Sequence, residues 1–172
     1  MIKFLTKAAL AATVATGLLA TPAIAANSAS APFTARATIV KPLTLVKASD
    51  LDFGTITMGA ALTSSNVVVG RSGGPASSCG TNLTCTGTQT AASFNVTGVA
   101  LQTLNVSLSP LASLVNTADA TKTVAFSANP DASVTLDNLG AGSFDIGGSI
   151  TVAATTADGD YLGSVDVTVT YQ

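Results

Sequence analysis

The chain has 172 residues, and its nine acidic and seven basic side chains make up 9% of it, against about 25% in ordinary soluble domains. All nine acidic residues are Asp and there is no His, which excludes histidine-dependent nucleophiles and imidazole metal sites. The few basic residues exclude a nucleic-acid-binding surface, and the missing His and Glu predict a protein that is not an enzyme and holds no cofactor or metal.

Residues 1–25 have the order of a secretory signal peptide. Two lysines precede a 13-residue apolar run over 8–20, and small residues end the segment at Ala25. The run is too short to span a bilayer, so we expect cleavage after Ala25 rather than a membrane anchor. The mature chain then has no membrane span. We expect it in the periplasm, on the cell surface or in an extracellular fibre.

Residues 26–39 allow two interpretations. The stretch FTARATI (33–39) alternates along the chain, so one face carries Phe33, Ala35, Ala37 and Ile39. It is either the first strand of its own domain, or an N-terminal extension that serves as a donor strand for a neighbouring molecule. The short side chains of Ala35 and Ala37 are weak anchors, which favours a strand of its own domain.

The rest of the mature chain shows no helical periodicity. Short alternating or apolar runs are separated by Gly, Asn, Asp, Pro and Ser, and the full chain contains 26 Thr, a residue that favours strands. We therefore predict a single all-β domain over 26–172, an immunoglobulin-like antiparallel β-sandwich with a small β-barrel as the alternative. The predicted strands after residue 40 cover 43–47, 50–56, 66–70, 93–98, 103–109, 123–127, 133–139, 143–147, 149–154 and 164–171.

One core of ordinary size is expected to hold these strands together. It is predicted to consist of Leu51, Phe53, Phe94, Val96, Val106, Leu108, Val124, Phe126, Val134, Leu136, Ile150, Val152, Val167 and Val169.

The two cysteines lie in a Gly/Ser/Thr-rich stretch over 70–90, which reads as a loop. Cys79 and Cys85 are an even pair in an exported chain, which predicts a disulfide. Its small loop should contribute about 2 kcal/mol in the chain-entropy model. A metal site is not indicated, because there is no second Cys pair and no His.

Two groups of carboxylates resemble functional sites without completing one. Asp50 and Asp52 share one face of a predicted strand, where the solvated side is the better interpretation than a pair of catalytic acids. Asp158 and Asp160 flank Gly159 as in part of a calcium loop, but the residues that follow do not supply the further ligands. A turn before the last strand is therefore expected there.

The chain ends on a strictly alternating stretch. One side of it carries Val165, Val167, Val169 and Tyr171, and the other carries Ser and Thr with one Asp. Strands left at the edge of a sheet invite pairing with another chain, so this strand is either paired internally or meant for a partner.

Two stretches carry a resemblance to a known family. PLTLVKASDLDFGTI (42–56) and GDYLGSVDVTVTYQ (159–172) resemble the start and end of the domain-of-unknown-function family 4402, short secreted proteins of Gram-negative bacteria. The matching residues are Pro42, Leu43, Leu45, Asp50, Leu51, Asp52, Phe53, Gly54, Gly159, Tyr161, Gly163, Val167, Val169, Tyr171 and Gln172.

The DLDFG segment and the last strand are also similar to the spore-coat-protein-U-like domain, which includes subunits of archaic chaperone–usher pili. This resemblance implies a sandwich that lacks one strand and is completed by a neighbour's N-terminal extension, with a periplasmic chaperone and usher as partners. The chain has Lys41-Pro42-Leu43 where such subunits usually carry a Cys after the first strand. The expected function is a fimbria-like surface subunit that assembles with itself, and the alternative is a monomeric secreted or periplasmic sandwich that binds a ligand.

Overall fold

The computed structural model describes residues 28–172, and the predicted signal peptide lies outside the described residues. Every ladder in this part of the chain is antiparallel, so the all-β class is confirmed. No helix within residues 28–172 is long and apolar enough to cross a membrane. The strands are β1 (Thr44–Ser49), β2 (Thr55–Met58), β3 (Ser64–Val69), β4 (Leu83–Thr86), β5 (Ala92–Thr97), β6 (Thr103–Leu108), β7 (Ser113–Asn116), β8 (Thr123–Pro130), β9 (Ser133–Thr135), β10 (Ala141–Ala153), β11 (Tyr161–Leu162) and β12 (Val167–Tyr171).

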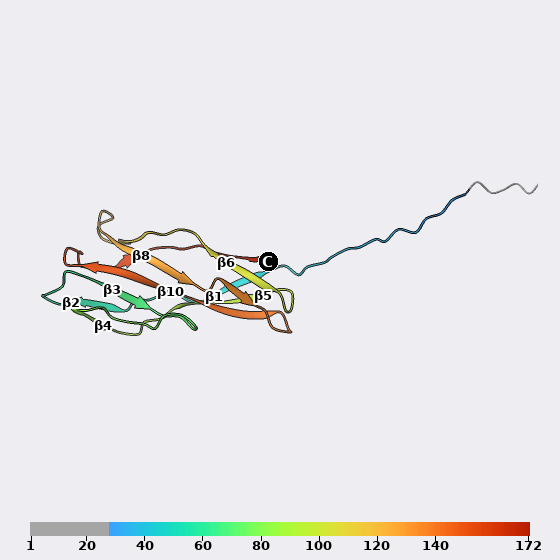
Figure 1. Ribbon diagram of the computed structural model, residues 1–172. Helices are drawn as coiled ribbons and strands as arrows, with labels where there is room; N and C mark the ends of the chain where they lie inside the picture. The colour runs from blue at the N-terminus through green and yellow to red at the C-terminus, as the bar shows by residue number, and fades with distance from the viewer. Residues whose placement is uncertain (1–27) are drawn as a thin grey trace, which may run out of the picture. The chain divides into compact units, whose positions relative to one another are not determined.

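The 13-residue strand β10 organises the domain over 38–172 because its two halves have different neighbours. Its first half pairs with β5, and β1 extends the sheet beyond β5. Its second half pairs with β3 and β8, and β7 and β11 continue the sheet beyond β8. Accordingly β2, β3 and β4 lie at one end of the domain, and β1, β5 and β6 at the other (Figure 1).

The sequence predicted a break inside β10 that the structure does not have. Gly147 and Gly148 suggested a turn between two strands, but both belong to the continuous β10. A Cβ on Gly147 would come within 2.5 Å of the Val69 carbonyl oxygen, and one on Gly148 within 3.0 Å of the Phe126 ring. These glycines therefore allow close packing against β10 rather than a reversal of the chain.

A second, three-stranded sheet, in the order β12-β6-β9, packs over the first half of β10 and makes a β-sandwich. The two sheets enclose a buried cluster, here called the first cluster, in which Leu104 of β6 is 0% exposed. The rings of Phe94 and Phe144 stack with their centroids 5.4 Å apart. The buried members of the first cluster are Phe94, Val96, Leu104, Val106, Leu136, Phe144 and Ile146.

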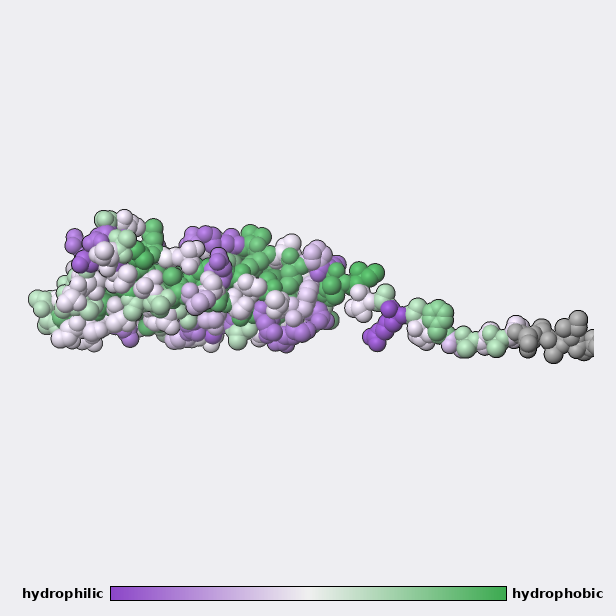
Figure 2. Space-filling model, turned by 90° about the horizontal axis from the view of Figure 1, so that it is seen from above, coloured by the Kyte–Doolittle hydropathy of each residue, from purple (hydrophilic) through white to green (hydrophobic). Residues whose placement is uncertain are grey.

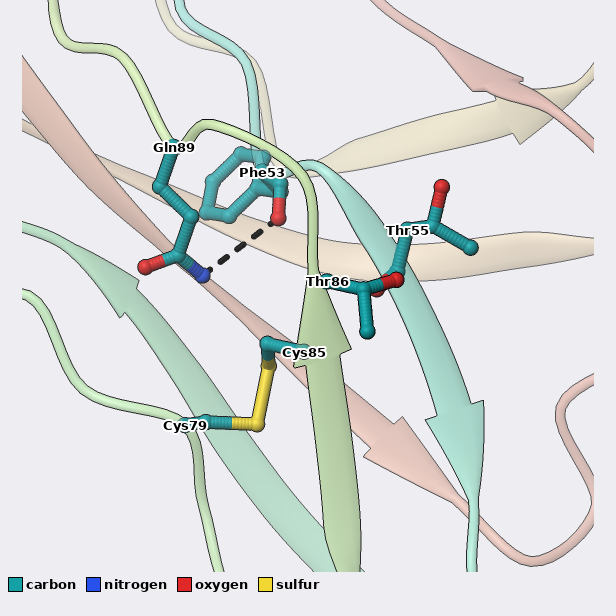
Figure 3. The surroundings of a disulfide bond; sticks show 6 residues. All are labelled: Phe53, Thr55, Cys79, Cys85, Thr86 and Gln89. Carbon is teal, nitrogen blue, oxygen red and sulfur yellow. Dashed lines mark hydrogen bonds between the residues drawn. A yellow bond between two sulfur atoms is a disulfide. The ribbon is translucent and has the colours of Figure 1, made fainter.

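A second cluster occupies the other half of the domain, so the expectation of a single core is wrong. Its buried members are Leu62, Val67, Val124, Ile150 and Val152. The pair β2–β4 packs onto it through Ile56, Leu83 and Cys85, although the sequence placed 83–86 in a loop. The predicted disulfide joins Cys79 of the preceding loop to Cys85 of β4, and nearby the Gln89 amide donates a hydrogen bond to the Phe53 carbonyl (Figure 3).

Residues 28–43 form no strand, and the side chains of 28–40 are exposed. The expectation that FTARATI (33–39) is the first strand of its own sandwich is therefore wrong. The alternation in this stretch is not used by any ladder between the described residues. Since Phe33 is 89% exposed and Ile39 is 93% exposed, the two large apolar side chains of the stretch are left without a core.

Other predicted strands moved or shortened. The stretch 50–56 contributes an isolated bridge at Asp52 and the start of β2, and the stretch 133–139 contributes only β9. The strands β7 and β11 had no clear pattern in the sequence, because each is short and has only one or two inward side chains. The final strand begins at Val167, and Val165 lies half-buried just before it.

Candidate functional site

Two strands beside the first cluster have a free edge. Strand β1 pairs only with β5, and strand β12 pairs only with β6, among the ladders of residues 28–172. The first belongs to the large sheet and the second to the three-stranded sheet. Both therefore border the same end of the sandwich with one unpaired side each.

The free edge of β12 presents the backbone groups of alternate residues. The Asp166 carbonyl accepts a hydrogen bond from the Ser109 amide, one residue past β6, and the Gln172 amide donates to the Thr103 carbonyl of β6. Because hydrogen bonding alternates in an antiparallel strand, the N–H and C=O groups of Val167, Val169 and Tyr171 point away from β6. They form a row of donors and acceptors that a further strand can pair with.

The side chains of the same residues form an apolar strip. Five side chains pack against the first cluster and are each half-buried: Leu43 just before β1, Leu45 in β1, and Val167, Val169 and Tyr171 in β12. We call these five residues the edge strip. The half of the domain that holds β1, β5 and β6 also carries much of the hydrophobic surface seen in Figure 2. Apolar surface and unpaired backbone thus coincide at one place.

The hydroxyl of Tyr171, at the end of β12, forms hydrogen bonds next to the start of β1. It donates to the Lys41 carbonyl at 2.9 Å and accepts from the Val99 amide at 2.9 Å. Gly98 leaves room for this contact, because a Cβ there would come within 2.6 Å of the Tyr171 hydroxyl and 2.7 Å of a Leu43 methyl. The end of β12 therefore lies beside the start of β1, and the two strands run in opposite directions.

The two free edges differ in how well they are protected. Strand β1 has an irregularity in its register between Lys47 and Ser49, and the Lys47 ammonium forms an ion pair with Asp50 at 2.6 Å. Bulges and edge lysines are devices that discourage pairing with other chains. Strand β12 is regular over its five residues and contains no Lys and no Pro. Of the two free edges, that of β12 therefore lacks these protective features.

The structure separates the predicted site residues into two groups. Val167, Val169 and Tyr171 lie together in the edge strip, with Val165 just before it. Phe33, Ala35, Ala37 and Ile39 are all exposed and outside any strand. Sequence reasoning did not assign Leu43 and Leu45 to the site, although their alternation was visible.

The carboxylates form no site with one another. Asp50 is held by Lys47, and the Asp52 carboxylate accepts a hydrogen bond from the Gly54 amide at 2.8 Å. The Asp158 and Asp160 carbonyls accept from Asn116 and Thr117, so this stretch is a turn between β10 and β11. Within residues 28–172 no three potential metal-binding side chains of His, Cys, Asp or Glu gather together.

Comparison with known proteins gives one match. None of the curated proteins and none of the solved structures that were compared matches the chain. A family model, domain of unknown function (DUF4402), matches residues 43–171, the span that begins and ends in the edge strip. The chain therefore belongs to the domain of unknown function family DUF4402.

Proposed function

We propose that this protein is an exported, non-enzymatic structural subunit that assembles into a fimbria-like fibre. In the fibre, residues 33–39 of one copy pair as a strand with the free edge of β12 in another copy. The observation that carries the proposal is the unprotected edge of β12, which lies beside an apolar strip in a chain with an unpaired alternating segment.

The two parts are chemically complementary. A donated strand supplies partners for the outward backbone groups of Val167, Val169 and Tyr171, and each such hydrogen bond contributes a net of about 1 kcal/mol. Phe33 and Ile39 are the large side chains on the inward face of the donor, and the edge strip is the apolar surface that covers them. Ala35 and Ala37 let the donor backbone approach closely between these two anchors.

The length of the link favours donation between molecules. Three residues, Val40 to Pro42, separate Ile39 from Leu43, so their Cα atoms are at most about 14 Å apart. In an antiparallel donor whose Ile39 pairs with Val167 and whose Ala35 pairs with Tyr171, Ile39 lies about 14 Å along the strand from the Tyr171 end, where Leu43 lies. Within one molecule, the three-residue link would have to be fully extended to cover this distance. It would then have no residues left for the turn that brings the chain back to Leu43.

A donor from the same molecule in the parallel sense is also disfavoured. It would need a tight turn over Val40 to Pro42, which contains no Gly or Asn for the positive φ angles of such turns. Pro42 also restricts Lys41 to extended backbone. The antiparallel, intermolecular arrangement leaves the acceptor's own extension free for the next copy, as an open fibre requires.

Before assembly, the edge strip needs a temporary cover. By the resemblance to pilin subunits, a periplasmic chaperone is the partner that protects this edge and an usher is the site of assembly. The alternative of a monomeric ligand-binding protein has less support. Two open hollows within 38–172 have volumes of about 260 and 460 Å³, and Lys41 is the one charged side chain among the residues that line them.

The proposal is tested with the protein produced with its own N-terminal segment in a host that forms disulfides. The intact protein should form heat-resistant oligomers whose size grows with concentration, seen by light scattering and gel electrophoresis without boiling. Deletion of residues 26–39 should leave a folded but less stable monomer. A synthetic peptide of residues 28–40 should bind this deleted form and raise its melting temperature.

Substitutions in the donor supply the matched control. Phe33→Asp with Ile39→Asp should abolish the oligomers, because both residues lie on the face that meets the strip. Thr34→Asp with Thr38→Asp adds the same charge to the opposite face and should leave assembly intact. An intact protein that stays monomeric at all concentrations, or two double variants that behave alike, would refute strand donation.

A further inference from the structure

We propose that the tip of the domain carrying Leu101 and Leu139 is a contact surface for a second copy of this chain. It seats against the hollow beside the start of β12 in the copy that accepts the donor strand. This proposal rests on the function proposed above, and it adds an interface between folded domains to the donated strand.

The tip consists of two loops that hydrogen bonds fix to one another. The Leu101 amide donates to the Asp137 carbonyl at 3.0 Å, and the Gly98 amide donates to the Gly140 carbonyl at 2.8 Å. The Asp137 carboxylate accepts from the amides of Leu139 and Ala141 at 2.8 and 2.9 Å. The loops 98–102 and 136–140 therefore form one rigid surface.

This rigid surface presents two large apolar side chains to solvent. Leu139 is 81% exposed and Leu101 is 70% exposed. Leu101 also has a φ of 61°, a left-handed conformation that is unfavourable for a leucine. Backbone strain of this kind persists where the surroundings hold it and often marks a functional position. The Leu101 side chain belongs to neither hydrophobic cluster.

The tip lies where the extension leaves the domain. Leu139 and Gly140 line a hollow together with Lys41 and Pro42, the two residues that precede the edge strip. When residues 33–39 pair with an acceptor, the link of three residues holds this part of the donor's domain within about 14 Å of the acceptor. The tip therefore faces the acceptor as a consequence of strand donation.

The acceptor has an apolar hollow at the end where the donor strand finishes. An antiparallel donor places Ile39 beside Val167, and the residue before it, Asp166, bonds through its backbone to the amide and hydroxyl of Ser109. Ser109 is one of the residues that line the hollow of about 460 Å³. Most of the other lining residues are apolar, among them Leu108, Leu111, Ala112 and Phe126.

A second copy is the occupant that satisfies both features. Projecting leucines at one end of the domain and an apolar hollow beside the start of β12 are complementary surfaces, and a head-to-tail contact between them continues along an open fibre. The contact buries apolar surface that otherwise faces water at both places. It also fixes the angle between neighbouring subunits, which a donated strand with a three-residue link leaves variable.

The first test replaces both leucines with asparagine, which suits a positive φ and keeps the tip folded. Leu101→Asn with Leu139→Asn should leave the thermal stability of the form deleted for residues 26–39 unchanged or higher. In the intact protein, the protein concentration needed for half-maximal assembly should rise by about tenfold. Met58→Asn, at an exposed apolar residue of β2, is the matched control and should leave assembly unchanged.

The second test locates the contact directly. Leu139→Cys with Ala112→Cys in one chain should give a ladder of linked species with a flexible thiol-reactive crosslinker, since residues 28–172 contain no other free cysteine. Leu139→Cys with Met58→Cys should give no ladder. Oligomers that form normally without the ladder, or that ignore the leucine substitutions, would overturn the tip contact while strand donation stands. If the parent protein forms no oligomers, both proposals fail together.

Discussion

The two hydrophobic clusters of the domain are closed to different degrees. The second cluster is covered by the β2–β4 pair, and a disulfide fastens the loop before β4 to that strand. The first cluster has buried residues of similar kind, but its border is the half-buried edge strip between two strands with free edges. The second cluster is thus covered by a strand pair that a disulfide stabilises, whereas the first cluster is uncovered on one side.

On the proposed function, this difference marks the place where a donated strand acts. Residues 33–39 have the alternation of a strand that could cover the open side. On that proposal, the short link over Val40 to Pro42 keeps this strand from its own domain. Variants in each cluster measure how independent the two clusters are.

The largest effect is expected in the centre of the first cluster. Leu104 is fully buried, so Leu104→Ala should lower the free energy of unfolding of the form deleted for residues 26–39 by about 3 kcal/mol. Val169→Ala, in the half-buried strip, should lower it by less than about 1 kcal/mol in the same form. Urea titration measures both. Equal losses would mean that the first cluster is not packed until a donor covers it.

A smaller effect is expected from opening the second cluster. Replacing Cys79 and Cys85 together by Ala removes a short loop constraint and should lower the free energy of unfolding by about 2 kcal/mol. Binding of the peptide of residues 28–40 should be unchanged, because the disulfide lies in the half of the domain away from the edge strip. Calorimetry of peptide binding checks this. A loss of binding would show that the two clusters are coupled through β10.

The sequence patterns predicted which residues form strands better than they predicted which strands lie next to one another. The inward positions of β5, β6 and β12 follow from alternation, which depends only on local geometry. Leu43 and Leu45 lie near β12 only because the more than one hundred residues between them fold back on themselves. A local sequence pattern does not predict such a contact. For the same reason, alternation over 33–39 predicted a strand, whereas this stretch pairs with no other strand of the described residues.

Two further differences have local causes that the sequence hides. A pair of glycines occurs both in turns and in tightly packed strands, so the sequence alone does not tell which structure Gly147 and Gly148 adopt. The close approach of Val69 and Phe126 to these glycines is visible only in the structure. Strand β4 is four residues long within a stretch rich in Gly and Thr, so its inward Leu83 and Cys85 are too few to establish a period. For the candidate site, the sequence predicted the side formed by β12 but not the side formed by Leu43 and Leu45.

The smallest effect concerns two exposed carboxylates, one beside each cluster. Hydrogen bonds from the amides of Ala141 and Leu139 lower the pKa of Asp137 in the tip. Hydrogen bonds from the hydroxyl and amide of Thr121 lower the pKa of Asp119 in the turn before β8. Since both pKa values are lowered by folding, each group contributes stability above the ordinary aspartate value of about 3.9, and the contribution is lost as the pH falls through the folded pKa.

Asp137→Asn and Asp119→Asn should therefore each remove a small part of the acid sensitivity of folding, seen as flatter plots of unfolding free energy against pH in the acid range. At neutral pH the two variants should differ in assembly. Asp137→Asn weakens the bonds that fix Leu139 in the tip, so intact protein should need a higher concentration to assemble. Asp119 lies beside the second cluster, so Asp119→Asn should not change assembly. Equal assembly of both variants at neutral pH would show that the rigidity of the tip has no part in the contact between subunits.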